Sequence, residues 1–408
     1  MKCRHCGERL NLTLVDLGSS PPSNAYIQPH KQSLPEVWYP LRVLVCEACW
    51  LVQTEDFISE AGDLFDEEYA YFSSYSSSWL AHASHYVTSM SERFGLSAES
   101  LVMEVAANDG YLLRYFQERG VPCFGVEPTR STAEAARALG LEIVEAFFGE
   151  PLARDLVRSK GQVDLALGNN VLAHVPDIND FVAGFRECLK PSGVLTFEFP
   201  HVQKLLEHVQ FDTIYHEHYS YLSLHSVCHI LERQGLEVFD VEELTTHGGS
   251  LRVYGQRRES RPHMVTPRVA EVLSAEIAAG LCSRAVYERF GREVFDLKLR
   301  FLEALVAAKR AGKRVVAYGA AAKGNTLLNY VGVRADFIDY VVDRNPHKQG
   351  RLMPGSRIPI VGEFGSDVPD IVLILPWNLR DEIIGDLSLI FEANIQYLTY
   401  QDMSRSSI

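Results

Sequence analysis

The sequence lacks the features that usually identify membrane proteins, secreted proteins and nucleic-acid-binding proteins. No apolar run approaches the roughly 18 residues that a membrane-spanning helix needs. The first residues, MKCRHCGERL, do not contain the apolar core of a signal peptide. The net charge of −14 gives no basic excess for nucleic acid or an anionic membrane, although a local basic pocket for a phosphorylated small molecule is compatible with it. We therefore expect a cytoplasmic protein that binds neither nucleic acid nor membrane.

A low-complexity tail and an internal repeat are also absent from the sequence. The hydrophobic content of 47% and the charged content of 23% are those of a globular protein. A chain of 408 residues is too long for one hydrophobic core, so about two to three domains are expected.

Cysteine is scarce, and the pairs CRHC and CEAC lie close to the N-terminus. A thioredoxin-like redox motif would need one such pair in a βαβ context, whereas a closed tetrahedral zinc site needs two pairs. Because four sulfurs complete the coordination, this zinc would be structural, and His5 would be a bystander. The expected ligands are Cys3, Cys6, Cys46 and Cys49.

The segment around these cysteines is small and has the pattern of a zinc-stabilised module. The alternating stretch PLRVLVCEACWLVQ predicts two strands around the second cysteine pair. So short a segment buries little apolar surface, whereas zinc binding contributes roughly 10–16 kcal/mol in zinc-finger peptides. We expect the metal to hold this module together.

From about residue 100 onward, strands and helices alternate along the chain. The segments LVMEVAANDGYLL, VPCFGVEP and VDLALGNNVLAHVPD each read as a buried strand that ends in a polar turn, and STAEAARALG reads as a helix. This alternation predicts a parallel, doubly wound sheet. Residues 256–312 read as a connecting helix. A second strand–turn–helix pattern then begins at KRVVAYGAAAKGNTLLNYV.

The first strand of this α/β region ends in a turn suited to a nucleotide-containing cofactor. A dinucleotide fingerprint needs three glycines to seat a pyrophosphate, and here only Gly110 is present. S-adenosylmethionine has no pyrophosphate, so the turn favours this cofactor over NAD. The alternative is an α/β core that binds no nucleotide. The candidate cofactor residues are Glu104, Ala106, Asn108 and Gly110 in the turn, Glu127 after the second strand, and Asn169 and Asn170 after a later strand.

A series of segments in one order resembles the sugar-nucleotide C-methyltransferases of deoxysugar pathways, best known as 3-C-methyltransferases. The resemblance covers essentially the whole chain and includes DLGSSPPSNAYI, EYAYFSSYSSSW, EVAANDGYL, NNVLAHVPDIN, GVLTFEFPH, IYHEHYSYLS, HGGSLRVY and AYGAAAKGNTLLNY. One departure is Ala106, where family members often have glycine. We expect the additional methyl group to narrow the turn without blocking the cofactor.

The resemblance implies an α/β protein in three parts, with S-adenosylmethionine and structural Zn²⁺ as cofactors. These parts are a zinc-binding domain at 1–62, a class I methyltransferase domain with a Rossmann-like sheet at 63–255, and a C-terminal Rossmann-like domain with a leading helix at 256–408. The C-terminal domain is implied to hold the nucleotide of a nucleoside-diphosphate-linked keto-deoxysugar. Lys323 in the GAAAKG turn is a candidate phosphate ligand, with a solvated helix end as the alternative. Asp343 and Lys348 are candidates for the ribose or base.

The stretch TIYHEHYSY combines imidazoles, phenols and a carboxylate, as proton abstraction next to a ketone requires. Carbon attacks a methyl donor only after an enolate forms, which needs a base and a donor for the oxyanion. The sequence H-E-H lacks the H-E-x-x-H spacing of a helical metal site, which argues against a catalytic metal.

By resemblance, the sugar site contains Tyr69, His174, Tyr215, Glu217 and His218. We predict that His218 is the base at C3 and that Tyr215 is its acid–base partner, although these two roles can be exchanged. His174 would polarise the keto oxygen, Glu217 would orient a neighbour and Tyr69 would line the pocket.

Three other readings remain open at this point. Methylation at C5 or another carbon of a related sugar nucleotide is the nearest. An NAD-dependent epimerase or dehydrogenase would need three turn glycines and usually a Tyr-x-x-x-Lys pair, and the first α/β half fits neither. A non-catalytic zinc-ribbon binding protein would have no need of the intact polar cluster around His218.

Overall fold

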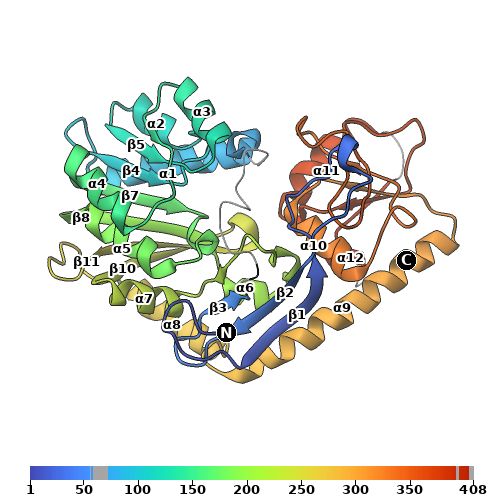
Figure 1. The fold of residues 1–408 in the computed structure, drawn as a ribbon, viewed down its shortest axis with the longest axis horizontal. Coiled ribbons are helices and arrows are strands. Elements are labelled where there is room, and N and C mark those ends of the chain that lie inside the picture. Colours follow the sequence, from blue (N-terminus) through green and yellow to red (C-terminus); the bar gives the residue numbers. More distant parts are fainter. Residues whose placement is uncertain (56, 58–71, 392–394, 404–408) are drawn as a thin grey trace.

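The computed structural model describes residues 1–408 except 56, 58–71, 392–394 and 404–408. Three sheets and the helices around them make up the described part of the chain (Figure 1). No helix in this part is long and apolar enough to cross a membrane.

The N-terminal sheet is antiparallel and has the order β1-β2-β3-β9. Its strands are β1 (Leu12–Ser20), β2 (Tyr39–Val45), β3 (Val52–Thr54) and β9 (Ser220–Tyr221). The predicted strands on either side of the second cysteine pair are therefore present. The last strand comes from the distant stretch TIYHEHYSY and pairs with β3. The zinc-binding module thus shares a sheet with the predicted catalytic segment.

The central sheet has seven strands in the order β10-β11-β8-β7-β4-β5-β6. Five of them are parallel, namely β4 (Val102–Val105), β5 (Cys123–Val126), β6 (Ile143–Val144), β7 (Val163–Asn169) and β8 (Leu189–Pro200). The other two, β10 (Leu236–Leu244) and β11 (Ser250–Arg257), form an antiparallel hairpin that pairs with β8. The expectation of a fully parallel sheet is wrong for this hairpin, because the loop at Thr245–Gly249 is too short for a parallel crossover.

Helices cover both faces of the central sheet, because its strands present apolar side chains in both directions. On one face Met103 and Val105 of β4 pack with residues of α4 (Glu150–Lys160), α5 (Ile178–Cys188) and α7 (Leu224–Arg233). On the other face Val102 packs with α1 (Ser77–Phe94), α2 (Leu113–Glu118) and α3 (Arg130–Ala138). Glu104 lies between these apolar positions at the carboxyl end of β4.

The C-terminal sheet is parallel, with the order β14-β13-β12-β15-β16. Its strands are β12 (Val315–Tyr318), β13 (Val341–Val342), β14 (Ile360–Val361), β15 (Ile371–Ile374) and β16 (Gln396–Leu398). The helices that accompany it are α10 (Ala322–Val331), α11 (Arg380–Ser388) and α12 (Tyr400–Met403). The strand order reverses between β12 and β15, and ligands of such sheets bind beyond the carboxyl ends of the strands at this point.

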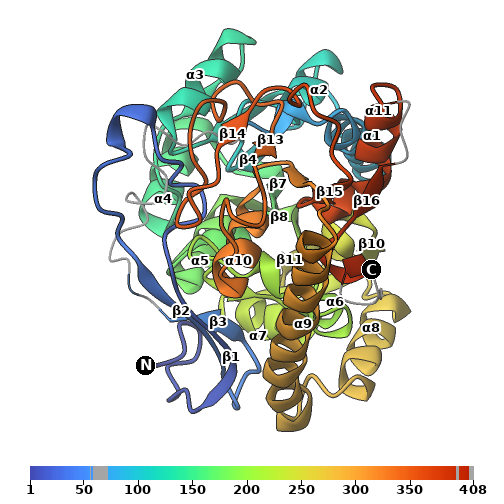
Figure 2. The same cartoon turned by 90° about the vertical axis from the view of Figure 1, so that its right-hand side faces the viewer.

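Two helices, α8 (Pro267–Ala278) and α9 (Arg284–Arg310), occupy the region predicted as one connecting helix. The long helix α9 runs from beneath the central sheet to the C-terminal domain (Figure 1), and Figure 2 shows it beside β1. Leu14 of β1, Phe290 and Phe301 of α9, and Val315 of β12 belong to one buried cluster. The N-terminal and C-terminal parts therefore share a hydrophobic core.

Candidate active site

The four predicted zinc ligands converge on one point. Their sulfur atoms all lie within 4.8 Å of one another. The Sγ atoms of Cys3 and Cys49 are 3.7 Å apart, and those of Cys6 and Cys46 are 3.5 Å apart. A tetrahedral zinc site with Zn–S bonds of ~2.3 Å requires sulfurs about 3.8 Å apart. The cluster therefore fits a closed Cys₄ zinc site.

The first cysteine pair docks on the start of α5 and the loop before it through polar contacts. The Nδ1 of His5 donates to Oδ1 of Asn179 at 2.8 Å, and the guanidinium of Arg4 donates to the carbonyl of Pro176 at 3.0 Å. His5 is thus occupied by the domain interface and lies outside the sulfur cluster.

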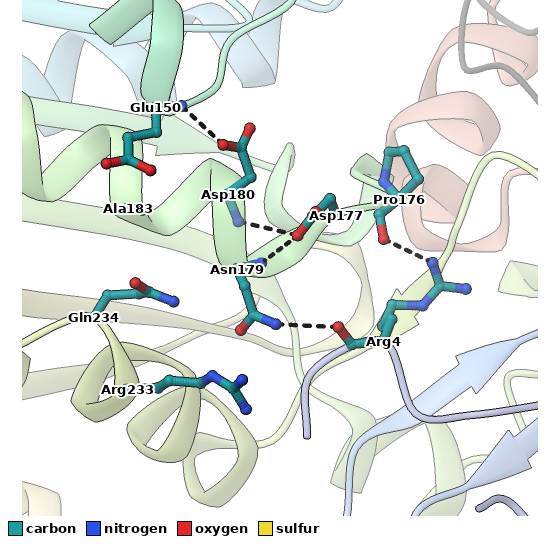
Figure 3. A pocket seen from close by; sticks show the side chains of 9 residues that line it. All are labelled: Arg4, Glu150, Pro176, Asp177, Asn179, Asp180, Ala183, Arg233 and Gln234. Carbon is teal, nitrogen blue, oxygen red and sulfur yellow. Dashed lines mark hydrogen bonds between the residues drawn. The ribbon is translucent and has the colours of Figure 1, made fainter. Parts of the chain in front are cut away.

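An open groove of about 500 Å³ lies at this junction (Figure 3). Its polar side chains bind one another or the backbone, as when Asp177 accepts from the first amides of α5 and Asp180 accepts from the amide of Glu150. The groove lining includes neither the predicted cofactor residues nor the cluster around His218. We therefore read this groove as a domain junction.

Glu104 is the most unusual residue of the predicted cofactor turn. Its side chain is buried, and neither carboxylate oxygen has a hydrogen-bond partner in the described part of the protein. Burial, with the nearby charges of Glu127 and Asp109, raises its pKa well above the usual value. An unpartnered buried carboxyl group is costly unless a ligand supplies donors. S-adenosylmethionine carries an ammonium group, ribose hydroxyls and an adenine amino group, so the residue fits this cofactor.

The turn after β4 contains three residues in the left-handed region, with φ of 60° at Ala106, 48° at Asn108 and 77° at Gly110. At Gly110 a Cβ atom would lie 2.4 Å from Leu141 Cδ1, so packing as well as backbone conformation requires glycine. Asn108 Oδ1 also accepts from the amide of Ser73 at 2.9 Å, which ties the turn to the FSSYSSSW segment.

Glu127 is held by internal hydrogen bonds. Its carboxylate accepts from the amide of Asn108 at 2.9 Å, the amide of Thr129 at 2.9 Å and the hydroxyl of Thr132 at 3.1 Å. Burial raises its pKa, and these hydrogen bonds oppose the rise. A carboxylate accepts about four hydrogen bonds, so capacity remains for a ribose hydroxyl. Glu127 fixes the turn and leaves room for the predicted ligand contact.

Of the two predicted amides, Asn169 is the last residue of β7, where it pairs with β8, and Asn170 follows it. The side chain of Asn169 is buried, and its amide group has no hydrogen-bond partner among the described residues. Asn170 has a left-handed φ of 54°, and its Nδ2 donates to Nε2 of His247 at 3.3 Å. Asn169 is therefore available to a ligand, whereas Asn170 connects this edge to the HGGSLR loop.

A buried ion network next to these amides was not predicted from the sequence. Glu198 of β8 pairs with Asn169 in register and binds Nε2 of His82 at 2.9 Å and the Arg252 guanidinium at 3.0 Å. Burial is the largest influence on the pKa of Glu198 and raises it, but the bonds to His82 and Arg252 outweigh it and hold the pKa below the usual value. The segments FEFPH and HGGSLR already marked Glu198 and Arg252, but their pairing depends on the antiparallel register of β8 and β11.

His218 lies in a cluster of aromatic rings. Its ring centroid is 4.0 Å from that of Tyr215 and 4.6 Å from that of His174. Its Nδ1 is 2.8 Å from the carbonyl of Thr213. A carbonyl only accepts, so Nδ1 carries the hydrogen and Nε2 keeps a lone pair. Burial, and then the charge of His174, lower the pKa of His218 well below the usual value, so the ring is neutral near pH 7.

Tyr215 and His218 line a narrow cavity of about 80 Å³ together with His247 and Lys323. The predicted acid–base pair and the predicted phosphate ligand Lys323 therefore share one cavity. His201, which the sequence did not single out, also lines it and binds the buried carboxylate of Glu276 through Nε2 at 2.7 Å.

Glu217 does not line this cavity. Its carboxylate is buried and accepts from Nδ2 of Asn24 at 3.1 Å, which anchors the DLGSSPPSNAYI loop. His174 contacts His218 through its ring, and burial lowers its pKa to about 4. Tyr69 lies outside the described residues.

The three predicted substrate residues of the C-terminal domain fall into two groups. Asp343 accepts from the amide of Ala320 at 2.7 Å, and Lys348 donates to the carbonyl of Ala320 at 2.8 Å. Both thus hold the turn at the carboxyl end of β12. Lys323 instead donates to Oδ1 of Asn378 at 2.6 Å and lies beside Trp377.

Comparison with known protein families gives matches to three domains in the order found here. A zinc binding domain matches residues 3–65, a methyltransferase domain matches residues 79–241, and a C-methyltransferase C-terminal domain matches residues 245–400. Among curated proteins, the C-methyltransferase NovU of Streptomyces niveus is 35% identical over 387 residues, which cover 94% of this chain and 91% of NovU.

Two solved methyltransferase structures each cover less than half of the chain. Magnesium protoporphyrin IX methyltransferase from Synechocystis PCC 6803 with bound SAM is 13% identical and covers 44% of this chain and 79% of its own, with a TM-score of 0.34. A SAM-dependent methyltransferase from Thermotoga maritima is 18% identical and covers 45% of this chain and 94% of its own, with a TM-score of 0.34. Likenesses this distant carry no inference about the reaction.

Proposed function

The chain belongs to the family of S-adenosylmethionine-dependent C-methyltransferases, and on this premise we propose that it methylates C3 of a nucleotide-linked 4-keto-deoxyhexose. The observation that carries the proposal is His218, a neutral imidazole with its Nε2 lone pair available at the edge of a small cavity. A carbon becomes nucleophilic when a base removes a proton next to a carbonyl group, and His218 supplies that base.

Residues of the cavity have complementary roles in the proposed reaction. His218 Nε2 takes the proton, and the electron pair of the broken C–H bond moves toward the carbonyl oxygen. Tyr215 lies against the His218 ring and is the acid–base partner, and His174 orients the base from its other side. When bound, S-adenosylmethionine supplies an electrophilic methyl group. The carbon nucleophile accepts this methyl group, and the electron pair of the broken C–S bond remains on sulfur. The residues that fit this cofactor are Glu104, Ala106, Asn108, Gly110, Glu127, Asn169 and Asn170.

The C-terminal domain supports a nucleotide-linked substrate. Its parallel sheet reverses strand order between β12 and β15, where α/β sheets bind nucleotides. Asp343 and Lys348 lie at this position and are the proposed contacts to the ribose or base.

The test is the structure of the product. The protein is incubated with S-adenosylmethionine carrying a ¹³C-methyl group and with thymidine, guanosine and cytidine diphosphate-linked 4-keto-6-deoxyhexoses, and the products are analysed by NMR. We expect a ¹³C-methyl group bonded to C3 of one of these sugars. A methyl group on C5 would refute the proposed position, and a methyl group on oxygen would refute carbon methylation itself.

A further inference from the structure

Lys323 is a cation from the C-terminal domain that reaches the cavity beside the proposed base. It is the second residue of α10, directly beyond β12. Its side chain lines the same cavity as Tyr215, His218 and His247. Burial is the main cause that lowers the pKa values of His218 and His247. The charge of Lys323 lowers both of these pKa values further. The ammonium group is thus close to both imidazoles.

The position of the ammonium group is fixed by the loop beyond β15. Nζ donates to Oδ1 of Asn378 at 2.6 Å and lies 4.5 Å from the centre of the Trp377 ring. Trp377 in turn donates through Nε1 to Oδ2 of Asp212 at 2.7 Å, and Asp212 also accepts from the hydroxyl of Tyr400 at 3.0 Å. The ring of Trp377 is therefore held in place beside the ammonium group of Lys323.

Among the described residues, this ammonium group has no direct anionic partner. No carboxylate of the described residues lies within ion-pair distance of Nζ, and Asp212 acts only through space. Burial lowers the pKa of Lys323 to about 8 while Asp212 opposes the shift, so the group is mostly charged near pH 7. A half-buried charge with one neutral acceptor and one aromatic ring is poorly compensated. The arrangement is suited to an anion that forms inside the cavity.

We propose that Lys323 is a catalytic residue that stabilises the enolate oxygen during methyl transfer. This inference rests on the proposed function. When His218 removes the proton, the C–H electron pair becomes the second bond between the two carbons, and the carbonyl π pair moves onto oxygen. Lys323 donates an N–H to that oxygen and remains protonated. When the C–C bond forms to the methyl carbon, the carbonyl bond is restored and the hydrogen bond weakens.

The lining of the cavity favours this role over binding of the diphosphate. Lys323 lines it together with Tyr215 and His218, the proposed acid–base pair, whereas Lys348 is not among the lining residues. Lys348, which binds the turn beyond β12, is better placed for the nucleotide. Donors aimed at a developing oxyanion typically contribute a factor of about 10² to 10³ in rate.

The test measures kcat and KM of Lys323→Met, Lys323→Gln and the wild-type protein with a saturating ¹³C-methyl donor. The substrate is a thymidine diphosphate-linked 4-keto-6-deoxyhexose, or whichever 4-keto sugar the wild type methylates. We expect kcat to fall about 100-fold with KM changed less than about threefold. Exchange of the α-proton with D₂O in the absence of the donor should fall by a similar factor, which a merely structural change would not cause selectively. Lys323→Arg should recover part of the rate because it keeps the charge.

Lys298→Met is the matched control, because Lys298 is also half-buried over an aromatic ring, at 4.4 Å from the Tyr330 centroid, and does not line the cavity. It should keep wild-type kcat.

Raised KM with unchanged kcat and unchanged proton exchange in both Lys323 variants would overturn the oxyanion role and support phosphate binding. Methyl transfer without any α-proton exchange in the wild type would overturn the inference. Failure of the wild type to methylate any sugar tested would refute the proposed function as well.

Discussion

One hydrogen bond, from Nδ1 of His218 to the carbonyl of Thr213, decides which imidazole nitrogen can act as a base. The carbonyl fixes the hydrogen on Nδ1 and directs the lone pair of Nε2 elsewhere. Burial keeps the ring neutral near pH 7. The roles of His218 and Tyr215, which the sequence leaves interchangeable, are therefore best assigned with His218 as the base.

This assignment predicts the acid limb of the pH–rate profile. A base must be neutral to accept a proton, and burial with the charge of His174 lowers the pKa of His218 well below 6.5. We expect kcat/KM to stay on its plateau as pH falls through 6.5 and to decline only below it. Initial rates between about pH 5 and 8 measure this. An acid limb at or above pH 6.5 would contradict the assignment.

Thermal unfolding over the same pH range is the control for that profile. A histidine whose folded pKa is lowered resists protonation only in the folded state, so stability declines as pH falls below its unfolded value of about 6.5. A decline of kcat/KM at low pH is attributed to protonation of His218 only at pH values where the folded fraction of the protein is unchanged.

Individual cofactor residues show what the sequence could predict. The turn after the first strand was recognisable from Gly110. Among the described residues, the buried polar atoms of Glu104 and Asn169 have no hydrogen-bond partner, which is compatible with their predicted contact to the cofactor. The left-handed conformation of Ala106, with φ of 60°, could not be read from the sequence, because alanine rarely adopts it. Glycine would adopt this conformation without strain.

Strand β9 connects the zinc module to the catalytic segment. It pairs with β3, which follows the second cysteine pair directly. The hydroxyl of Thr54 in β3 donates to the carbonyl of His218 at 3.0 Å, and its amide donates to the carbonyl of Tyr219 at 3.1 Å. The zinc site therefore supports the backbone that carries the proposed base.

We expect Cys46→Ser to abolish zinc binding, lower the melting temperature and reduce activity even at temperatures where the protein stays folded. The physical reason is that a structural zinc site contributes several kcal/mol to folding, and loss of the second knuckle loosens β3 under His218. Zinc content by mass spectrometry, thermal unfolding and methyl-transfer rate are measured together.

Cys282→Ser is the control for this experiment, because Cys282 lies outside the sulfur cluster. It should keep zinc, stability and activity. A Cys46→Ser protein with wild-type melting temperature and rate but without metal would show that zinc has no structural role here.

At the level of strands, local pattern predicted β2, β3, β4, β5, β7 and the opening of the C-terminal sheet, but not the two-residue strand β6. It did not predict β9, because two residues are too few to carry a periodic pattern. It also missed the hairpin of β10 and β11, whose antiparallel direction follows from the short connection at Thr245–Gly249. Strand direction is set by the connection and is not encoded in the strand itself.

The complete molecule is more closely integrated than three domains in series. The N-terminal sheet, α9 and the C-terminal sheet share one core (Figure 2). The cavity beside His218 is lined by residues from the middle of the chain and by Lys323 of the C-terminal domain. The sequence identified these residues separately. The position of Lys323 beside His218 could not be predicted, because the docking of one domain on another leaves no local signal.

The most direct test of the account is exchange of the α-proton of a nucleotide-linked 4-keto-6-deoxyhexose with D₂O, followed by NMR without methyl donor. The wild-type protein should replace the proton at C3 by deuterium, and His218→Gln should slow this replacement at least about 100-fold while still binding S-adenosylmethionine. His208→Gln, an exposed histidine at the end of α6 (Val202–Glu207), should exchange at the wild-type rate. Exchange at the wild-type rate in the folded His218→Gln protein would contradict the account.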